Sequence, residues 1–290
     1  MIDIFITGST GAIGKRILPK LEEKNFNVTP VNLRKPNNLG SDCKSSENSW
    51  MIHLASINSK MTEEDIHVEK NMIESAIDIA LTKGIKNFIF FSSSKLYPAS
   101  CNKNLSAEDS DPCITDPYSK GKMECELILK AKAEKFKSVS IFRLAPVLIR
   151  SPSSNVNLLF KICEILPLIP LFPAGDKNLR SFLSLKNLEL FLETYLQRNL
   201  EGLSILNICD KSPITTNMLI NKFLDKYRSK TIRFRMPKFL EYLLLNMPIL
   251  GKKLNSLFGN NIIDNSKINQ ALPDLDLLET SEAIRLYGLH

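Results

Sequence analysis

The stretch from Asp3 to Gly14, DIFITGSTGAIG, decides the fold of this chain. A short apolar run with β-branched residues leads into a loop with three glycines, and apolar residues at helical spacing follow as far as Leu21. A diphosphate needs backbone amides and a helix N-terminus close at hand, and side chains in the loop would block that approach. The glycine spacing also differs from that of a P-loop. We therefore predict a dinucleotide-binding loop rather than a plain glycine turn, with contacts at Gly8, Gly11, Ala12, Ile13 and Gly14.

Strand patterns and helix patterns alternate through the first half of the chain. Strands are predicted at 3–7, 27–33, 50–54, 86–91 and 139–144, with one more at 204–208. Helices are predicted directly after the glycine loop, at 63–82 and at 117–135. This alternation is typical of the α/β class, in which helices cover both faces of a doubly wound parallel sheet.

After Val147 the alternation is interrupted by clustered prolines and asparagines, and most of the remainder reads as helical. We expect residues 1–150 to form the dinucleotide-binding domain, joined by part of 182–210. Residues 151–290 are expected to form a smaller, mostly helical substrate-binding region. Ligands of open α/β sheets bind beyond the carboxyl ends of the strands, so this region would cap that crevice.

Composition and charge describe an ordinary globular chain. Of the 290 residues, 43% are hydrophobic and 24% are charged, which excludes intrinsic disorder. The net charge of +7 comes from Lys and Arg spread along the sequence rather than from a tract interleaved with aromatic residues, so we do not expect nucleic acid as a partner. The six cysteines have no C-x-x-C spacing, and we expect neither a metal site nor a disulfide framework.

No apolar run reaches the roughly 18 residues that a membrane span requires, and the N-terminus has no signal-peptide pattern. We therefore expect a cytoplasmic protein with no integral membrane segment. The segment Phe234–Leu257 mixes Leu and Met with basic residues, a pattern shared by helices that touch a membrane surface. We favour the alternative, a helical wall of the substrate-binding region. The basic residues are Arg235, Lys238, Lys252 and Lys253.

The end of the second predicted strand bears on the choice of cofactor. An acidic residue at this place bonds the ribose hydroxyls of NAD, whereas an arginine accommodates the 2′-phosphate of NADP. Here the sequence after Val31 is Asn32-Leu-Arg34-Lys35, with no acid and two cations. We favour NADP(H), with NAD(H) as the alternative, and predict cofactor contacts at Asn32 and Arg34. The competing interpretation is a solvated turn.

Tyr118 and Lys122 are one helical turn apart if a helix begins at Pro117 with Asp116 as its N-cap. An ammonium beside a phenol favours the phenolate, which suits a tyrosine for acid–base chemistry near neutrality. The strand at 86–91 ends in a run of three serines, and a hydroxyl at that edge can bond a substrate oxygen. Taken alone, either pattern is common on protein surfaces.

Together these patterns resemble the extended short-chain dehydrogenase/reductase superfamily, in particular its NAD-dependent epimerase/dehydratase branch. The match covers nearly the whole chain and consists of several blocks in the family's order. The matching blocks are Thr7–Gly14, His53-Leu-Ala55, Asn71–Ser93, Tyr118 with Lys122, Asn178–Leu188, Leu206-Asn-Ile208 and Ile263–Pro273.

The resemblance implies a Rossmann domain, a C-terminal domain that holds a nucleotide sugar, and frequent homodimerisation through helices that include the one with Tyr118. Ser93 is the most natural active-site hydroxyl, with Ser94 as the fallback and a substrate contact. The resemblance also implies cofactor contacts at Leu54 and Ala55 and at the catalytic pair, and a diphosphate contact at Arg180. We further expect Asn157 to face the sugar.

The chain departs from the dehydratases of this family at Ser94-Lys95, where those enzymes carry a carboxylate. Dehydration is therefore disfavoured. The serine run followed by lysine is instead similar to proteins encoded with O-antigen or capsule genes, which include 4-keto-reductases and proteins labelled 4-epimerases. We expect an enzyme of surface polysaccharide biosynthesis that reduces a nucleotide-linked 4-keto-hexose at C4, with Ser93, Tyr118 and Lys122 as catalytic residues. The alternatives are a UDP-hexose 4-epimerase that recycles NAD, and a non-catalytic dinucleotide sensor.

Overall fold

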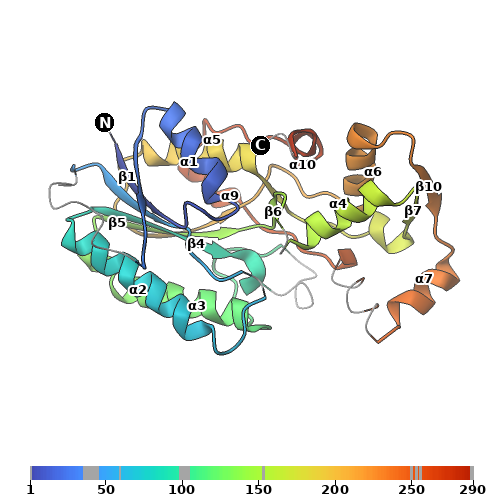
Figure 1. Cartoon of the computed structure of the whole chain (residues 1–290), viewed down its shortest axis with the longest axis horizontal. Coiled ribbons are helices and arrows are strands. Elements are labelled where there is room, and N and C mark those ends of the chain that lie inside the picture. The colour runs from blue at the N-terminus through green and yellow to red at the C-terminus, as the bar shows by residue number, and fades with distance from the viewer. Residues whose placement is uncertain are drawn as a thin grey trace.

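The computed structural model describes residues 2–34, 46–58, 60–97, 105–151, 154–248, 251, 254 and 257–287. Figure 1 shows a sheet layered between helices at one end of the molecule and a smaller lobe at the other. Several residues singled out from the sequence, namely Lys35, Cys43, Cys101, Lys252 and Lys253, lie outside the described residues.

The described residues form one main sheet of parallel strands, in the order β2-β1-β3-β4-β5-β9. The chain passes from β1 to β2 on one side and then to β3 on the other, so the direction of winding reverses between β1 and β3. Such a switch point leaves a crevice at the carboxyl ends of the strands. The strands are β1 (Asp3–Thr7), β2 (Asn27–Val31), β3 (Ser49–His53), β4 (Asn87–Ser93), β5 (Ser138–Leu144) and β9 (Gly202–Ile208).

Helices cover both faces of this sheet, as the sequence predicts (Figure 1). α1 (Gly14–Glu23) and α5 (Leu185–Leu196) pack on one face, and α2 (Ile66–Thr82) and α3 (Pro117–Ala131) pack on the other. Side chains alternate along a strand. Ile4 and Ile6 of β1 therefore belong to the core on the α1 and α5 side of the sheet, whereas Phe5 belongs to the core on the α2 and α3 side. β3 and β5 are buried along their whole length because both faces of the sheet are covered there.

The start of α3 follows the predicted capping pattern. The Asp116 carboxylate accepts a hydrogen bond of 2.7 Å from the backbone N–H of Ser119, and Pro117 occupies the first helical position. The Ser119 hydroxyl oxygen in turn accepts a hydrogen bond of 3.1 Å from the backbone N–H of Asp116, which completes a capping box. This cap sets the register of the helix and so places Tyr118 and Lys122 in its first turns.

The smaller lobe contains more strand than its sequence indicates. A parallel pair, β7 with β10, and a second short pair, β6 with β8, accompany its helices. These strands are at most four residues long, too short for a periodic pattern to be read. The elements are β6 (Val147–Leu148), α4 (Asn155–Ile165), β7 (Leu168–Leu171), β8 (Leu183–Ser184), α6 (Thr216–Tyr227), β10 (Ile232–Arg235), α7 (Lys238–Leu245), α9 (Ser266–Ala271) and α10 (Thr280–Ala283), with 3-10 turns η2 (Ser94–Leu96), η3 (Ala133–Lys135), η4 (Pro173–Asp176) and η5 (Ile284–Leu286).

Part of the C-terminal segment packs with the sheet rather than with the lobe. Ile263, Ile268 and Leu272 belong to the core that also contains the strands β1 and β5, whereas Ile284 and Tyr287 pack with the lobe. The chain therefore crosses between the two parts more than once. Besides part of 182–210, the segment with Ile263, Ile268 and Leu272 thus also packs with the sheet.

A buried ion pair fixes α3 to the sheet. The guanidinium of Arg143 on β5 donates to both carboxylate oxygens of Glu126 on α3, at 3.0 and 2.8 Å, and the Ser92 hydroxyl donates to the same carboxylate at 2.6 Å. Burial alone would raise the pKa of Glu126, but the hydrogen bonds from Arg143 lower it below its ordinary value. The carboxylate therefore stays charged inside the core.

We predict that Glu126→Gln lowers the free energy of unfolding by about 3–5 kcal/mol, because it leaves the Arg143 charge buried without its partner. Urea denaturation of the purified protein measures this change. The matched control is Glu193→Gln, which removes an exposed partner of Lys24 and should cost no more than about 1 kcal/mol. Equal losses in the two variants would contradict the role of the buried pair.

Candidate active site

A cleft of about 440 Å³ lies at the carboxyl ends of the strands. The glycine loop, the end of β4 and the start of α3 form its sheet side, and residues of the lobe form the opposite wall. Both sides carry residues that the sequence singled out. Those that line it are Gly8, Gly11, Ala12, Ile13, Gly14, Leu54, Ser93, Ser94, Tyr118, Lys122 and Arg180.

The glycine loop is shaped by two close approaches of backbone to backbone. Gly8 has φ +70°, and a Cβ at this position would lie 2.5 Å from the backbone nitrogen of Ala55, which follows β3. A Cβ at Gly14 would lie 2.3 Å from the carbonyl oxygen of Gly8. Only glycine tolerates such contacts. The loop therefore brings the N-terminus of α1 to the cleft with no side chain in between.

Thr7 and His53 join the ends of β1 and β3 beneath this loop. The Thr7 hydroxyl is 2.8 Å from Nδ1 of His53 and accepts a hydrogen bond of 3.2 Å from the backbone N–H of Ala55. Burial, together with the charge of Lys122, lowers the pKa of His53 to about 3, so the ring is neutral. In the His53-Leu54-Ala55 block, Leu54 lines the cleft, whereas Ala55 holds the loop through its backbone.

Tyr118 and Lys122 lie on the cleft side of α3, as their spacing predicts. Nζ of Lys122 is 5.8 Å from the centroid of the Tyr118 ring, and Nζ of Lys95 is 5.2 Å from it. The half-buried phenol thus lies near two ammonium groups.

Glu69 on α2 holds Lys122 in place, a role that sequence analysis missed. Its carboxylate is 3.0 Å from Nζ of Lys122, and the two side chains are 1% and 3% exposed. The Ser56 hydroxyl and the backbone N–H of Ile57 donate to the same carboxylate at 2.6 and 2.7 Å. Burial by itself would lower the pKa of Lys122, but Glu69 raises it above its ordinary value, so the ammonium is retained.

One signal in the sequence points to Glu69. Ile66, Ile73 and Ile77 form the buried face of α2, and Glu69 lies on the same face at helical spacing. A charge among inward-facing apolar residues needs a buried partner. The identity of that partner depends on the neighbouring helix and so on the tertiary structure.

The three serines at the end of β4 and the start of η2 have different surroundings. Ser92 donates to Glu126 and belongs to the buried pair described above. The Ser93 hydroxyl accepts a hydrogen bond of 3.2 Å from the backbone N–H of Lys95, and Ser93 and Ser94 both line the cleft. The two remaining serines therefore both lie at the cleft.

On the lobe side, Arg180 lines the cleft and donates from Nη1 to the carbonyl oxygen of Gly259 at 3.1 Å. Desolvation lowers the pKa of Arg180.

The structure does not place Asn157 as expected, facing a sugar. Its Oδ1 accepts a hydrogen bond of 2.9 Å from the Tyr287 hydroxyl, and it is buried in the lobe instead of lining the cleft. The first turn of α4 points its polar side chain into the packing of the C-terminal segment.

Asn32 and Arg34 follow β2 at the carboxyl edge of the sheet, where both are exposed and neither lines the cleft. The Asn32 side chain accepts a hydrogen bond of 2.9 Å from the backbone N–H of Arg34, which makes a compact turn. β2 is the neighbour of β1, so this turn lies on the glycine-loop side of the switch point.

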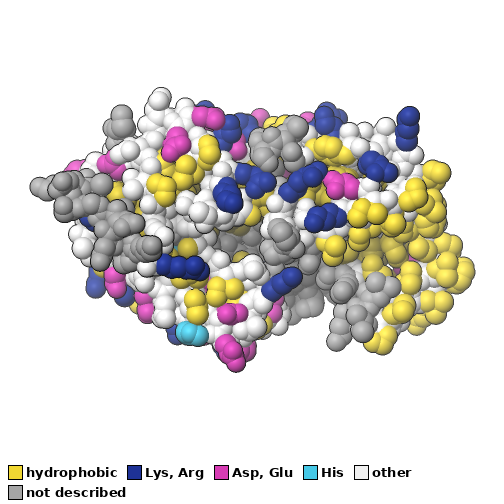
Figure 2. All heavy atoms as spheres, viewed as in Figure 1, with side chains coloured by type: hydrophobic (Ala, Val, Ile, Leu, Met, Phe, Trp, Pro, Cys, Tyr) yellow, Lys and Arg dark blue, Asp and Glu magenta, His cyan; other side chains and the backbone are white. Residues whose placement is uncertain are grey.

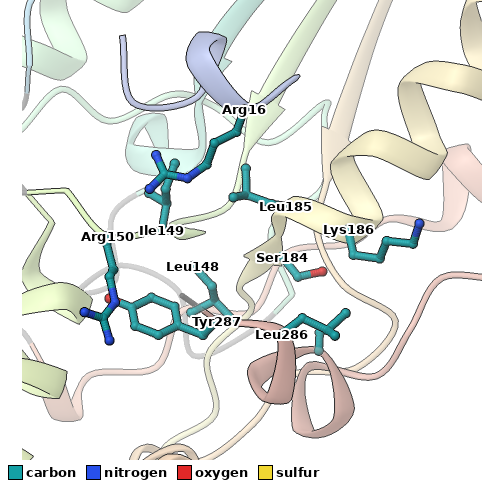
Figure 3. A pocket seen from close by; sticks show the side chains of 10 residues that line it. Arg16, Leu148, Ile149, Arg150, Ser184, Leu185, Lys186, Leu286 and Tyr287 are labelled. Carbon is teal, nitrogen blue, oxygen red and sulfur yellow. The ribbon is translucent and has the colours of Figure 1, made fainter. Parts of the chain in front are cut away.

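A second pocket carries three cations but has no room for a ligand. Figure 3 shows Arg16, Arg150 and Lys186 around it, with the Tyr287 ring next to Arg150. Its volume is about 10 Å³, which is no more than one water requires. Arg150 lies over the Tyr287 ring at 5.7 Å and pairs with Glu164. The cluster belongs to the packing of the C-terminal segment.

Among the described residues, no group of three or more His, Cys, Asp or Glu is placed to hold a metal ion.

Comparison with protein families agrees with this geometry. Residues 4–156 match the sequence model of the NAD dependent epimerase/dehydratase family. That range covers more than half of the chain and contains the glycine loop, the β4 serines and the Tyr118–Lys122 pair. The chain belongs to this family. A comparison with curated proteins found no significant sequence match.

Solved structures of similar fold cover almost the full chain. MoeE5 in complex with UDP-glucose and NAD has a TM-score of 0.73 at 17% identity, over 98% of this chain and 97% of that one. UDP-glucose 4-epimerase of Thermotoga maritima has 0.70 at 17%, over 99% and 97%. The dTDP-4-dehydrorhamnose reductase of Bacillus anthracis str. Ames, in complex with NADP, has 0.74 at 13%, over 100% and 99%. At these identities the likeness shows a shared Rossmann-type fold.

We predict that Gly8→Ala destabilises the fold more than a positive φ alone explains. The control is Gly202→Ala, because Gly202 also has a positive φ, +73°, but a Cβ there would meet nothing within 4 Å. We expect a loss of about 1 kcal/mol for the control and at least about 2 kcal/mol more for Gly8→Ala, measured by urea denaturation. Indistinguishable losses would show that the loop yields to a side chain.

Proposed function

We propose that this protein is an NAD(P)-dependent sugar-nucleotide oxidoreductase that reduces a nucleotide-linked 4-keto-hexose at C4. The observation that carries the proposal is the position of Tyr118 and Lys122 at a cleft that also contains the glycine loop and the β4 serines. Family membership supports it. The likeness to a dTDP-4-dehydrorhamnose reductase supports the same class of substrate.

The glycine loop fits the diphosphate of a nicotinamide dinucleotide. Side chains at Gly8 or Gly14 would collide with backbone, so the loop surface stays open. The N-cap position of α1, Ile13, has no capping side chain, which leaves the positive end of the helix to an anionic ligand. When bound, NADPH supplies the hydride that reduces the C4 carbonyl.

Tyr118 is the proton donor in this proposal. As C4 is reduced, the phenol gives its proton to the C4 oxygen and becomes a phenolate. Lys122 stabilises that phenolate, and its ammonium is kept charged and in position by Glu69 and by the carbonyl oxygen of Phe91 at 3.1 Å. Ser93, with Ser94 as the alternative, donates a hydrogen bond to the C4 oxygen, where negative charge develops.

The surroundings of the serines disfavour dehydration. A dehydratase of this family would need a carboxylate after the active-site hydroxyl to remove a carbon-bound proton, and this chain has Lys95 there. Nζ of Lys95 is 3.2 Å from the Asp116 carboxylate and close to the Tyr118 ring. It thus adds positive charge where a dehydratase would place a base.

Arg180 is the proposed contact to the substrate's diphosphate. Its guanidinium lies on the lobe wall of the cleft, and the planar fork matches phosphate oxygens.

The resemblance to proteins encoded with O-antigen or capsule genes supports a role in surface polysaccharide biosynthesis. A homodimer through helices that include α3 stays a prediction.

The rival reaction is 4-epimerisation, which uses the same residues. The fold likeness to a UDP-glucose 4-epimerase supports it as the second candidate. A reductase consumes one NADPH for each keto sugar and is inactive without added cofactor. An epimerase consumes none, so turnover of a UDP-hexose with retained NAD and no net oxidation would replace the proposed reaction with epimerisation.

We predict that Tyr118→Phe lowers kcat by about 10²- to 10⁴-fold while NADPH still binds, because only the proton donor is lost. Absorbance of NADPH during turnover of dTDP- and UDP-linked 4-keto sugars measures kcat, and fluorescence titration measures binding. Tyr242→Phe, on the remote helix α7, is the matched control and should leave kcat unchanged. Near-normal turnover by Tyr118→Phe would remove Tyr118 from the mechanism.

We predict that Arg34→Ala raises the Kd of NADPH by about tenfold, because a charge-assisted hydrogen bond to the 2′-phosphate is lost. The Kd of NADH should change by less than about twofold, since NADH lacks that phosphate. Lys20→Ala, an exposed cation on α1 paired with Glu23, is the control for general electrostatics. Equal effects on both cofactors would reject the proposed preference for NADP(H).

A further inference from the structure

Exposed apolar side chains are concentrated on the smaller lobe. Of the nineteen large hydrophobic side chains exposed in the described part of the chain, fourteen lie in residues 158–179 and 218–247. Figure 2 shows hydrophobic atoms gathered at the end of the molecule where Figure 1 places β7, β10 and α7. Scattered exposed leucines are ordinary, but a contiguous patch marks a binding surface. We define the apolar face by Ile165, Leu168, Ile232, Phe239, Tyr242 and Leu243.

α7 is the centre of this face. None of its residues is buried, although its sequence is KFLEYLLL. Oε1 of Glu241 accepts a hydrogen bond of 2.7 Å from the backbone N–H of Ala174, which turns the Glu241 side of the helix toward the lobe. At 100° per residue, Phe239 and Leu243 are then on the opposite side, and they are 66% and 58% exposed. The fold thus holds these side chains outward.

α4 and the short strands extend the apolar face. Val156, Phe160 and Cys163 form the buried row of α4, whereas Ile165 and other apolar residues form an exposed row on its outer side. A helix that is apolar on both sides is normally buried on both sides. On the adjoining strand pair, Ile232 is the register partner of Leu168, and both are exposed.

The same lobe carries most of the net positive charge of the protein. Residues 155–180 and 214–248 contain ten Lys and Arg but only four Asp and Glu, which is six of the seven net positive charges. Exposed cations lie on the elements that form the apolar face, among them Lys161, Arg235 and Lys238, and Lys230 is exposed in the turn before β10. Apolar side chains flanked by cations are the composition of a surface that lies on an anionic bilayer.

We propose that the apolar face docks on the surface of an anionic lipid bilayer. α7 lies in the interfacial plane with Phe239, Tyr242 and Leu243 in the headgroup–acyl boundary, a depth that suits aromatic side chains. The flanking lysines and arginines contact anionic headgroups. A second copy of this chain is the less suitable occupant, because two lobes with the same excess of positive charge repel each other. The described residues contain no helix long and apolar enough to cross the bilayer.

Vesicle sedimentation tests this proposal independently of enzymatic activity. The full chain is sedimented with phosphatidylcholine vesicles that contain or lack phosphatidylglycerol. We expect binding to the anionic vesicles that is at least about tenfold stronger than to phosphatidylcholine alone and that weakens as salt is added. The double variant Phe239→Ser with Leu243→Ser should lower the partition coefficient by about tenfold or more. Lys238→Glu should lower it by about fivefold.

The matched control is Leu127→Ser with Leu203→Ser, two exposed leucines of the sheet domain, which should leave vesicle binding unchanged. Circular dichroism checks that each variant is folded. Binding that ignores phosphatidylglycerol, or that survives the Phe239–Leu243 variant, overturns the proposal. A dimer in lipid-free sedimentation velocity that dissociates in that variant also overturns it, because it assigns the face to a second copy.

Discussion

The buried salt bridge between Lys122 and Glu69 is the contact on which the geometry of this protein depends. It joins α3 to α2 on one face of the sheet, and neither charge is accessible to water. Removing one partner would leave the other as an isolated charge in the core, which is far more costly than the loss of a surface pair. The same bond fixes the ammonium beside the Tyr118 ring, so one interaction sets both the packing of the two helices and the position of the Lys122 ammonium at the cleft.

A second contact, between the backbones of Gly8 and Ala55, fixes the position of the cleft that Tyr118 and Lys122 line. The backbone at Gly8 passes so close to Ala55 that β1 and β3 are held together just beyond their carboxyl ends. Thr7 and His53 bridge the same two strands from below. Because the reversal in strand order falls between β1 and β3, this contact also determines where the crevice opens. The glycine loop therefore holds β1 and β3 together. The same close packing requires glycine, which leaves the loop without side chains that would block a diphosphate.

The two ends of the molecule have different surfaces. The sheet end holds polar side chains inward, where Glu126 and Arg143 lock α3 to β5. The lobe end holds apolar side chains outward, supported by the anchored carboxylate of Glu241. The two lobe segments, 155–180 and 214–248, together hold six of the seven net positive charges. A cleft between these two ends is lined by both, which makes the lobe part of the site as well as a surface of its own.

Local patterns in the sequence determined the alternating strands and helices, the glycine turn and the capped start of α3. Each depends on residues a few positions apart, such as Asp116 with Ser119, so neighbouring residues suffice to predict it. Contacts between distant segments were decided only by the tertiary structure. These include the partner of Glu69, the return of Ile263 to the sheet core, and the turning of Asn157 toward Tyr287. A sequence specifies which side chains an element can present, but the element that faces them is chosen when the whole chain packs.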